Sequence, residues 1–206
     1  MKKSIVLLVS LLFITAISTL ILKNLDDTNE YISEQNYKLN QSQLLMMINN
    51  AKNEASKFIE KYPDDLKALE NIPFTLKDVE LQLSLIEYDK YDLNLLREND
   101  IEKYKSIQEF FWDNSVDGFE NLQYLLKGSE PISNSKQLDD IITTFIKQIY
   151  SDDILKIKDS LGFIKAPDDS KLYELKIRVN YLKQMAKAYY ILDKDGKVKY
   201  FELSFK

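Results

Sequence analysis

The side chains that could do chemistry in this chain are few in kind. Its 206 residues include no histidine and no cysteine. Histidine is the commonest general base and transition-metal ligand, and it is the usual partner of a catalytic serine. Without cysteine there are no disulfides, thiolate metal sites or thiol nucleophiles. Carboxylate, lysine, tyrosine and hydroxyl groups are therefore what is left for catalysis or metal binding.

Some of the carboxylates occur in patterns that are found in calcium sites. Asp193-Lys194-Asp195-Gly196 begins like an EF-hand loop, which needs glycine at its sixth position and glutamate at its twelfth. Here glycine is fourth and Ser204 is twelfth, so we expect a plain hairpin turn. Three aspartate pairs near expected helix starts are interpreted as helix caps, with calcium binding as the alternative. These pairs are Asp139-Asp140, Asp152-Asp153 and Asp168-Asp169.

The remaining candidate residues do not favour an enzyme. Glu109, Asp113 and Asp117 are carboxylates, but nothing in the sequence sets two of them at the defined separation that acid–base hydrolysis needs. Trp112 stands beside two phenylalanines and is expected in a hydrophobic core, with ligand stacking as the alternative. The sequence contains no glycine-rich phosphate loop, nucleophile-elbow motif or zinc motif. We predict a protein that is not an enzyme and has no catalytic residue, cofactor or bound metal.

Composition and charge limit the class of protein further. The chain has 28 basic and 33 acidic residues, a net charge of −5 and an isoelectric point near 5.0. An acidic surface argues against nucleic acid as a partner, because phosphate contacts need basic side chains. Hydrophobic residues make up 45% of the chain and aromatic residues 12%, which is ample for a packed core. The length suits one domain, or one domain with a large insert.

An uncharged apolar run near the N-terminus predicts a membrane anchor. Residues 5–22 read IVLLVSLLFITAISTLIL and follow Lys2 and Lys3, and a spanning helix needs roughly 20 apolar residues. The basic start places the N-terminus in the cytoplasm and the following residues outside. We therefore expect a single-pass protein of the bacterial inner membrane, in contact with lipid, with a periplasmic domain. The alternative is a signal peptide cut after Ser18, although the apolar run continues past that point.

The anchor is expected to continue as one long helix. No glycine or proline occurs before Pro63, which permits a helix on the order of 85 Å long. A narrow apolar seam with a seven-residue period then gives way, beyond Gln43, to a wider stripe suited to lie across a sheet. The seam consists of Leu25, Ile32, Leu39 and Met46, and the stripe of Leu44, Ile48, Ala51, Ala55, Phe58 and Tyr62. The seam fits either a simple stalk or lateral packing of membrane-rooted helices.

The rest of the chain predicts an antiparallel sheet that is interrupted by helices. Residues 79–85 alternate as a half-buried strand, and residues 91–95 are expected to extend it or pair with it. Residues 171–206 alternate as a three-stranded meander with a hairpin at Asp195-Gly196. Between them the apolar period is helical. The predicted parts are an anchor (1–23), the continuing helix (24–62), a first strand region (63–96), a helical insert (97–168) and C-terminal strands (169–206), which together make an α+β fold.

This order of elements resembles the type IV pilin superfamily, and within it the K-type minor pseudopilin of type II secretion, which carries a helical domain inserted in its pilin sheet. Lys2-Lys3-Ser4-Ile5-Val6-Leu7-Leu8-Val9-Ser10-Leu11-Leu12 is similar to the start of those proteins. Lys3 stands where their processing site usually has glycine, and Leu8 where pilins usually carry glutamate. The K-type pseudopilin also lacks that glutamate.

The resemblance implies a membrane-anchored filament subunit at the tip of a type II secretion or type IV pilus-like assembly. Its partners would be other pseudopilins or inner-membrane proteins of the secretion system, and it would take part in protein transport. Lys3 and Ser4 would form the processing site. The residues expected in the membrane and assembly helix are Ile5, Leu8, Leu12, Ile17, Leu22, Leu25, Ile32 and Leu39. The alternatives are a single-pass periplasmic scaffold or binding protein, or a binding module exported after cleavage by signal peptidase.

Overall fold

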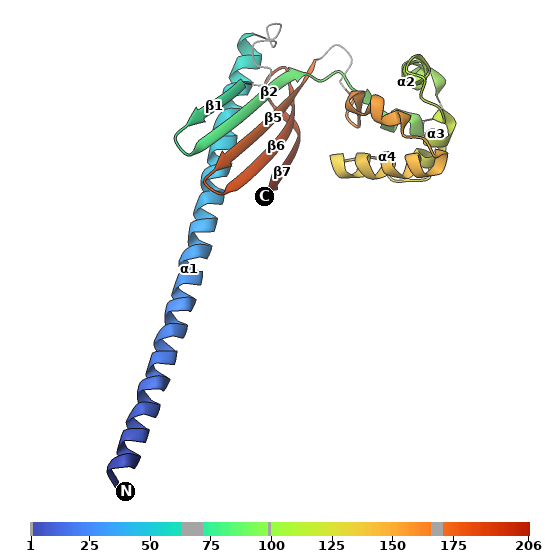
Figure 1. The fold of residues 1–206 in the computed structure, drawn as a ribbon. Helices are drawn as coiled ribbons and strands as arrows, with labels where there is room; N and C mark the ends of the chain where they lie inside the picture. Colours follow the sequence, from blue (N-terminus) through green and yellow to red (C-terminus); the bar gives the residue numbers. More distant parts are fainter. Residues whose placement is uncertain (1, 63–71, 99, 166–170) are drawn as a thin grey trace.

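The computed structural model describes residues 2–62, 72–98, 100–165 and 171–206, and it includes side chains from Ile17 onward except that of Leu76. The fold is α+β, as predicted: a long N-terminal helix, an antiparallel sheet and a group of shorter helices (Figure 1). The shorter helices stand to one side of the sheet, at the end opposite to the N-terminal part of the long helix. They lie between the second and fifth strands in the chain.

Helix α1 runs without interruption from Lys2 to Lys61, which is 60 residues or about 90 Å. The prediction of one continuous helix is therefore confirmed. The physical reason is the absence of glycine and proline before Pro63, because these two residues are the ones that end helices most strongly. An ion pair one turn apart, between Glu34 and Lys38 at 2.6 Å, adds a small local contribution on an exposed face.

Five of the described strands form one sheet in the order β1-β2-β5-β6-β7, with every neighbouring pair antiparallel. The strands are β1 (Ile72–Leu76), β2 (Val79–Glu87), β5 (Leu172–Tyr181), β6 (Gln184–Asp193) and β7 (Val198–Phe205). The predicted three-stranded meander at the C-terminus is confirmed by β5, β6 and β7. Strand β1 was not predicted, because Pro73 weakens the strand pattern, and it lies at an edge where proline is tolerated.

The turn between β6 and β7 is the predicted hairpin. The Asp193 carboxylate accepts hydrogen bonds from the backbone N–H groups of Asp195 (3.0 Å) and Lys197 (2.9 Å). Gly196 has a φ of +68°, a conformation that glycine adopts at little cost. The Ser56 hydroxyl in α1 donates a hydrogen bond of 3.0 Å to the Gly196 carbonyl oxygen. The hairpin therefore joins the last two strands of the sheet and also bonds to the long helix.

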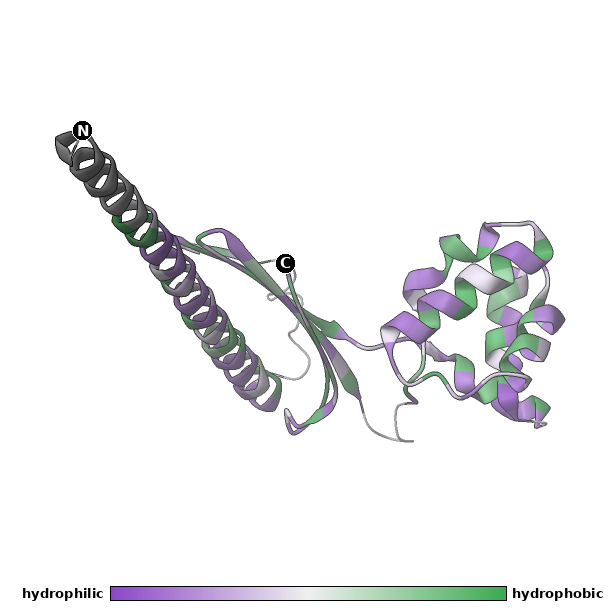
Figure 2. Cartoon of the chain, turned by 90° about the horizontal axis from the view of Figure 1, so that it is seen from below, coloured by the Kyte–Doolittle hydropathy of each residue, from purple (hydrophilic) through white to green (hydrophobic). Residues whose placement is uncertain are grey.

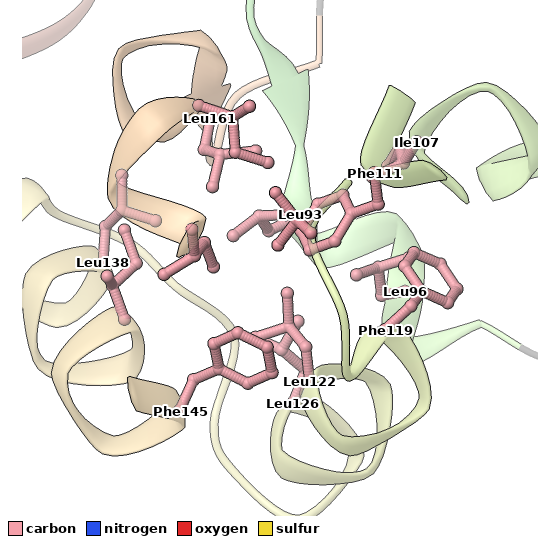
Figure 3. Close-up of a cluster of buried hydrophobic side chains, with 14 of the residues drawn as sticks. Leu93, Leu96, Ile107, Phe111, Phe119, Leu122, Leu126, Leu138, Phe145 and Leu161 are labelled. Carbon is pink, nitrogen blue, oxygen red and sulfur yellow. The ribbon is translucent and has the colours of Figure 1, made fainter. Parts of the chain in front are cut away.

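The insert has a hydrophobic core of its own. Its helices are α2 (Ile101–Asp113), α3 (Phe119–Lys127) and α4 (Ser135–Ile149), with the 3₁₀ turns η2 (Leu93–Arg97), η3 (Asp153–Lys156) and η4 (Lys158–Ser160). Apolar side chains from η2, α2, α3, α4 and the strand residue Leu161 point toward one another (Figure 3). Several of them are completely buried, among them Leu93, Phe111, Leu122 and Phe145. A core of this size lets the insert pack as a separate unit.

Two features at the base of the insert differ from the predictions. Residues 91–95 neither extend β2 nor pair with it: Tyr91–Asp92 forms β3, which pairs in parallel with β4 (Leu161–Gly162), and the chain then enters η2. The periodic segment around Ile154 and Ile157 forms 3₁₀ turns instead of an α-helix. The first difference arises because the pairing of residues 70 positions apart cannot be read from local periodicity.

The sheet has one face covered by α1 and one face that α1 leaves bare (Figure 2). Odd-numbered residues of β2 and β5 point to the covered face, where Leu85, Leu175 and Val179 are fully buried. The insert reaches the sheet at its far end, where the backbone N–H of Ser135, the first residue of α4, donates a 2.7 Å hydrogen bond to Glu202 of β7. Phe163 packs edge-on against Tyr200 at 5.0 Å between ring centres. These contacts place the N-terminus of α4 beside the bare face.

Candidate functional site: the two parts of the long helix

The last third of α1 is part of the hydrophobic core. Leu44, Ile48, Ala55 and Ile59 are at most 3% exposed and pack with side chains of β2, β5 and β6. Their spacing of four, seven and four residues keeps them on one side of the helix. The predicted wide stripe is confirmed for Leu44, Ile48 and Ala55, whereas Tyr62 is 54% exposed. This part of α1 has an apolar face that packs against the sheet.

The preceding part of α1 has an apolar seam that the described chain does not cover. Leu25, Ile32, Leu39 and Met46 are each between 50% and 59% exposed. Ile17 and Leu22 are also exposed, at 55% and 63%. Some of the intervening polar side chains bond within the helix itself, as where Gln41 donates to the Tyr37 hydroxyl at 2.9 Å. The predicted seam thus exists as an exposed row of apolar side chains: Leu25, Ile32 and Leu39 precede the segment that the sheet covers, and Met46 lies within that segment on another side of the helix.

The predicted anchor and processing site begin earlier in the same helix. Lys3, Ser4, Ile5, Leu8 and Leu12 lie within α1, but their side chains are outside the part of the chain that the structure describes, as are all those up to residue 16. Among the described residues, no helix has an apolar stretch long enough to cross a membrane. Most of the predicted span, residues 5–16, lies outside that search.

The acidic candidates are spread over the surface. Asp193 and Asp195 belong to the hairpin turn, as predicted; burial opposes ionisation of Asp193, but hydrogen bonds from the Lys197 N–H and Lys199 outweigh it and lower its pKa. Glu109, Asp113 and Asp117 are all exposed. No group of three or more potential metal-ligating side chains occurs among the residues described.

The prediction that the aspartate pairs cap helices is wrong for the first pair. Asn134 caps α4, accepting a 2.9 Å hydrogen bond from the Gln137 N–H, while Asp139 and Asp140 lie one turn further on. Asp152 precedes η3 without accepting a capping hydrogen bond. Asp168 and Asp169 lie outside the described residues. Asparagine is as good a cap as aspartate, and the prediction considered only the aspartate pairs and not Asn134.

Trp112 is not in the core of the insert. Its side chain is 62% exposed, whereas the neighbouring Phe111 is fully buried. Successive residues on a helix are 100° apart, and the inward face of α2 is already defined by Tyr104, Ile107 and Phe111. The helical phase therefore turns Trp112 outward, and the prediction of a core position is wrong.

A buried charge on the bare face of the sheet was not foreseen. Glu174 of β5 is 1% exposed and forms ion pairs with Lys90, at 2.9 Å, and with Lys176. It lies beside Tyr88 and Tyr189. Burial raises the pKa of the Tyr88 phenol to about 12 and also raises that of Tyr189. Strand alternation predicts a polar Glu174 facing away from α1, but alternation says nothing about aromatic side chains that cover it.

The comparisons with known proteins do not assign the chain to a family. No protein-family model matches its sequence, and no curated protein matches it at a significant level.

Proposed function

We propose that this protein is a non-enzymatic, membrane-anchored subunit of a type II secretion or type IV pilus-like filament, and that it acts as a minor pseudopilin at the tip. One observation carries the proposal. A single helix is packed into the core of the domain over its last third, while its preceding part projects from the sheet with apolar side chains exposed. A free-standing domain gains nothing from such a projection, whereas a subunit that packs side by side with others needs it.

The exposed row suits a neighbouring helix. Leu25, Ile32, Leu39 and Met46 recur every seven residues, which is the period that keeps a seam facing one partner helix. Each of them still has about half of its surface to bury. Full burial of such a side chain stabilises by about 1.5–3 kcal/mol, so the four together offer about 3–6 kcal/mol per neighbouring helix.

The insert supports a position at the tip. Helices α2 to α4 extend the domain sideways beyond the sheet (Figure 1), and a bulky domain would obstruct a further subunit added above it. The resemblance noted for the sequence adds that Leu8 replaces the glutamate with which pilins contact the subunit above. A terminal subunit does not need that contact.

The proposal includes a location and a set of partners. Residues 5–22 would anchor the chain in the bacterial inner membrane, with the sheet and the insert in the periplasm. The partners would be membrane lipid and the N-terminal helices of other pseudopilins. The buried carboxylate Glu174 is neutralised by Lys90 and Lys176, an arrangement suited to a structural role.

Site-specific photo-crosslinking tests the proposal directly. Because the chain has no cysteine, a single cysteine labelled with benzophenone-maleimide reports one position. Ile32→Cys lies in the exposed row, and Glu30→Cys, about 160° around the helix, is the matched control. We expect Ile32→Cys to crosslink in native membranes to proteins with a pilin-like N-terminal helix, and Glu30→Cys to give little product.

N-terminal sequencing and gene deletion complete the test. A mature protein that starts at Ser4 supports processing as a pseudopilin, whereas a start at Thr19 removes the anchor and favours the exported binding module. An intact Met1 without crosslinks favours the single-pass scaffold. Deletion of the gene is expected to impair secretion or pilus assembly, and a strain that secretes and assembles pili normally without it would contradict the proposal.

A further inference from the structure

The bare face of the sheet forms the floor of an open hollow of about 900 Å³. Strands β2, β5, β6 and β7 supply the floor, and Lys136 of α4 supplies part of the wall. Among the described residues that line it there are four basic side chains and one carboxylate. The basic side chains are Lys136, Lys176, Arg178 and Lys187, and the carboxylate is Glu202. We call this feature the basic hollow; it is positive in a chain whose net charge is −5.

The register of the strands concentrates the positive charge. Arg178 of β5 lies directly opposite Lys187 of β6, and Gln82 and Ser204 complete this row across the sheet. Like charges that face each other across a strand pair are destabilising. None of the ion pairs within the described part of the chain involves Arg178, Lys187 or Lys136, and the three side chains come from three different elements.

The carboxylates on the same face are already engaged elsewhere. Glu174 is paired with Lys90 and Lys176. Glu202 accepts hydrogen bonds from the Ser135 N–H at 2.7 Å and from the Tyr200 hydroxyl. Glu80 accepts one from the Asn180 side-chain amide at 3.0 Å. Among the described residues, Arg178 and Lys187 therefore have no neutralising partner.

The arrangement of the donors indicates what would neutralise them. Compact phosphate groups are usually bound with free backbone N–H groups at a helix N-terminus or in a nest. At the start of α4 two of these groups are occupied, because the Ser135 N–H donates to Glu202 and the Gln137 N–H donates to Asn134. What remains is a set of side-chain cations spread over two strands and a helix. Several carboxylates carried along an extended chain fit this spread, and arginine can bind a carboxylate through two parallel hydrogen bonds.

We propose that the basic hollow binds an extended, acidic peptide segment of another protein. Arg178 and Lys187 form the central carboxylate-binding pair, and Lys136 binds a further acidic side chain from the direction of the insert. The site thus joins the sheet to the insert and gives the domain a partner besides the helices along α1. The site does not use the N-terminal helix, so the proposal of peptide binding can be tested independently of filament assembly.

Fluorescence anisotropy with defined peptides tests this site. The full-length protein, purified in a non-ionic detergent at low ionic strength, is titrated into a labelled peptide of four Glu-Thr repeats. A peptide of four Gln-Thr repeats is the ligand control. The double variant Arg178→Gln/Lys187→Gln is compared with Lys105→Gln/Lys147→Gln, which removes two exposed lysines of the insert and changes the net charge equally. Circular dichroism establishes that both variants remain folded.

We expect the Glu-Thr peptide to bind the wild-type protein and the insert variant with affinities within twofold of each other. Binding to the hollow variant should be at least tenfold weaker, and the Gln-Thr peptide should not bind. Equal weakening in both variants would reveal a general charge effect and overturn the proposal. So would preference for inositol hexakisphosphate or for anionic lipid vesicles over the peptide, failure of the wild type to bind the peptide, or dimerisation through the same residues without peptide binding.

Discussion

Two leucines on α1 lie five residues apart and have opposite environments, which allows one chemical change to be compared in two places. Leu44 is fully buried between α1 and the sheet, whereas Leu39 is 57% exposed in the projecting row. We predict that Leu44→Ala strongly destabilises the domain. Leu39→Ala should leave the fold intact and weaken only contacts with other subunits.

The expected magnitudes follow from burial. Leu44→Ala removes three carbon atoms, which is about 2.4 kcal/mol of transfer free energy at about 0.8 kcal/mol per methylene. The cavity left beside the β strands raises the total loss to about 3–4 kcal/mol. At Leu39 there is little surface to lose, and alanine is a slightly better helix former, so the change should stay within about 0.5 kcal/mol.

Hydrogen exchange followed by mass spectrometry measures both effects in the full-length protein. Peptides that cover β5, residues 172–181, report the opening of the strand that packs against α1. Exchange of these amides should accelerate by more than a hundredfold in Leu44→Ala, since each 1.4 kcal/mol is a factor of ten. In Leu39→Ala it should change by no more than about threefold.

The reasoning fails if the two substitutions have similar effects on β5. Similar small effects would mean that α1 contributes little to the core of the domain. Similar large effects would mean that the row around Leu39 is already covered within one chain. In either case the division of α1 into a packed part and a projecting part would have to be abandoned.

Two further predictions concern the bare face of the sheet. Lys187→Glu replaces the like-charge pair of Arg178 and Lys187 with a pair of opposite charges. Urea unfolding should show a gain of about 0.5 kcal/mol in the free energy of unfolding. A loss of stability would contradict the inference that Arg178 and Lys187 repel each other without a neutralising partner. Tyr88 has its pKa raised from 10.0 to about 12 by burial. The stability that this raised pKa gives the folded protein is therefore present below about pH 10 and is lost as the pH rises towards 12. Urea unfolding of Tyr88→Phe should show a decline between these pH values that is smaller than in the wild type by about 2 kcal/mol, and an equal decline would refute the assignment.

Much of the fold follows from local features of the sequence. The absence of glycine and proline predicted α1, and the alternation of polar and apolar residues predicted β2, β5, β6 and β7. Strand β1 was not predicted, because five residues that include a proline give too weak a strand pattern. The exposure of Trp112 was not predicted, because its aromatic neighbours suggested a core position, whereas its place on the helix turns the side chain outward.

The candidate helix site could be predicted almost completely, because both its period and its change of character beyond Gln43 are local properties. Which apolar row is covered could not be predicted in the same way. The stripe at Leu44 and Ile48 is buried only because the sheet packs against that side of α1. Leu25, Ile32 and Leu39 are exposed because they precede the covered segment, and Met46 is exposed because it lies on another side of the helix.

The sequence by itself determined the long helix, the strand alternation, the Asp-Gly hairpin and the lack of histidine and cysteine chemistry, since each depends on residue types within one or two turns or strands. The tertiary structure decided the basic hollow and the buried Glu174. Arg178 and Lys187 are nine positions apart and face each other only through the register of β5 and β6. Lys136 joins them only because the insert rests against β7. These basic side chains form one site only when distant segments pack together, and that packing depends on long-range contacts that no local pattern specifies.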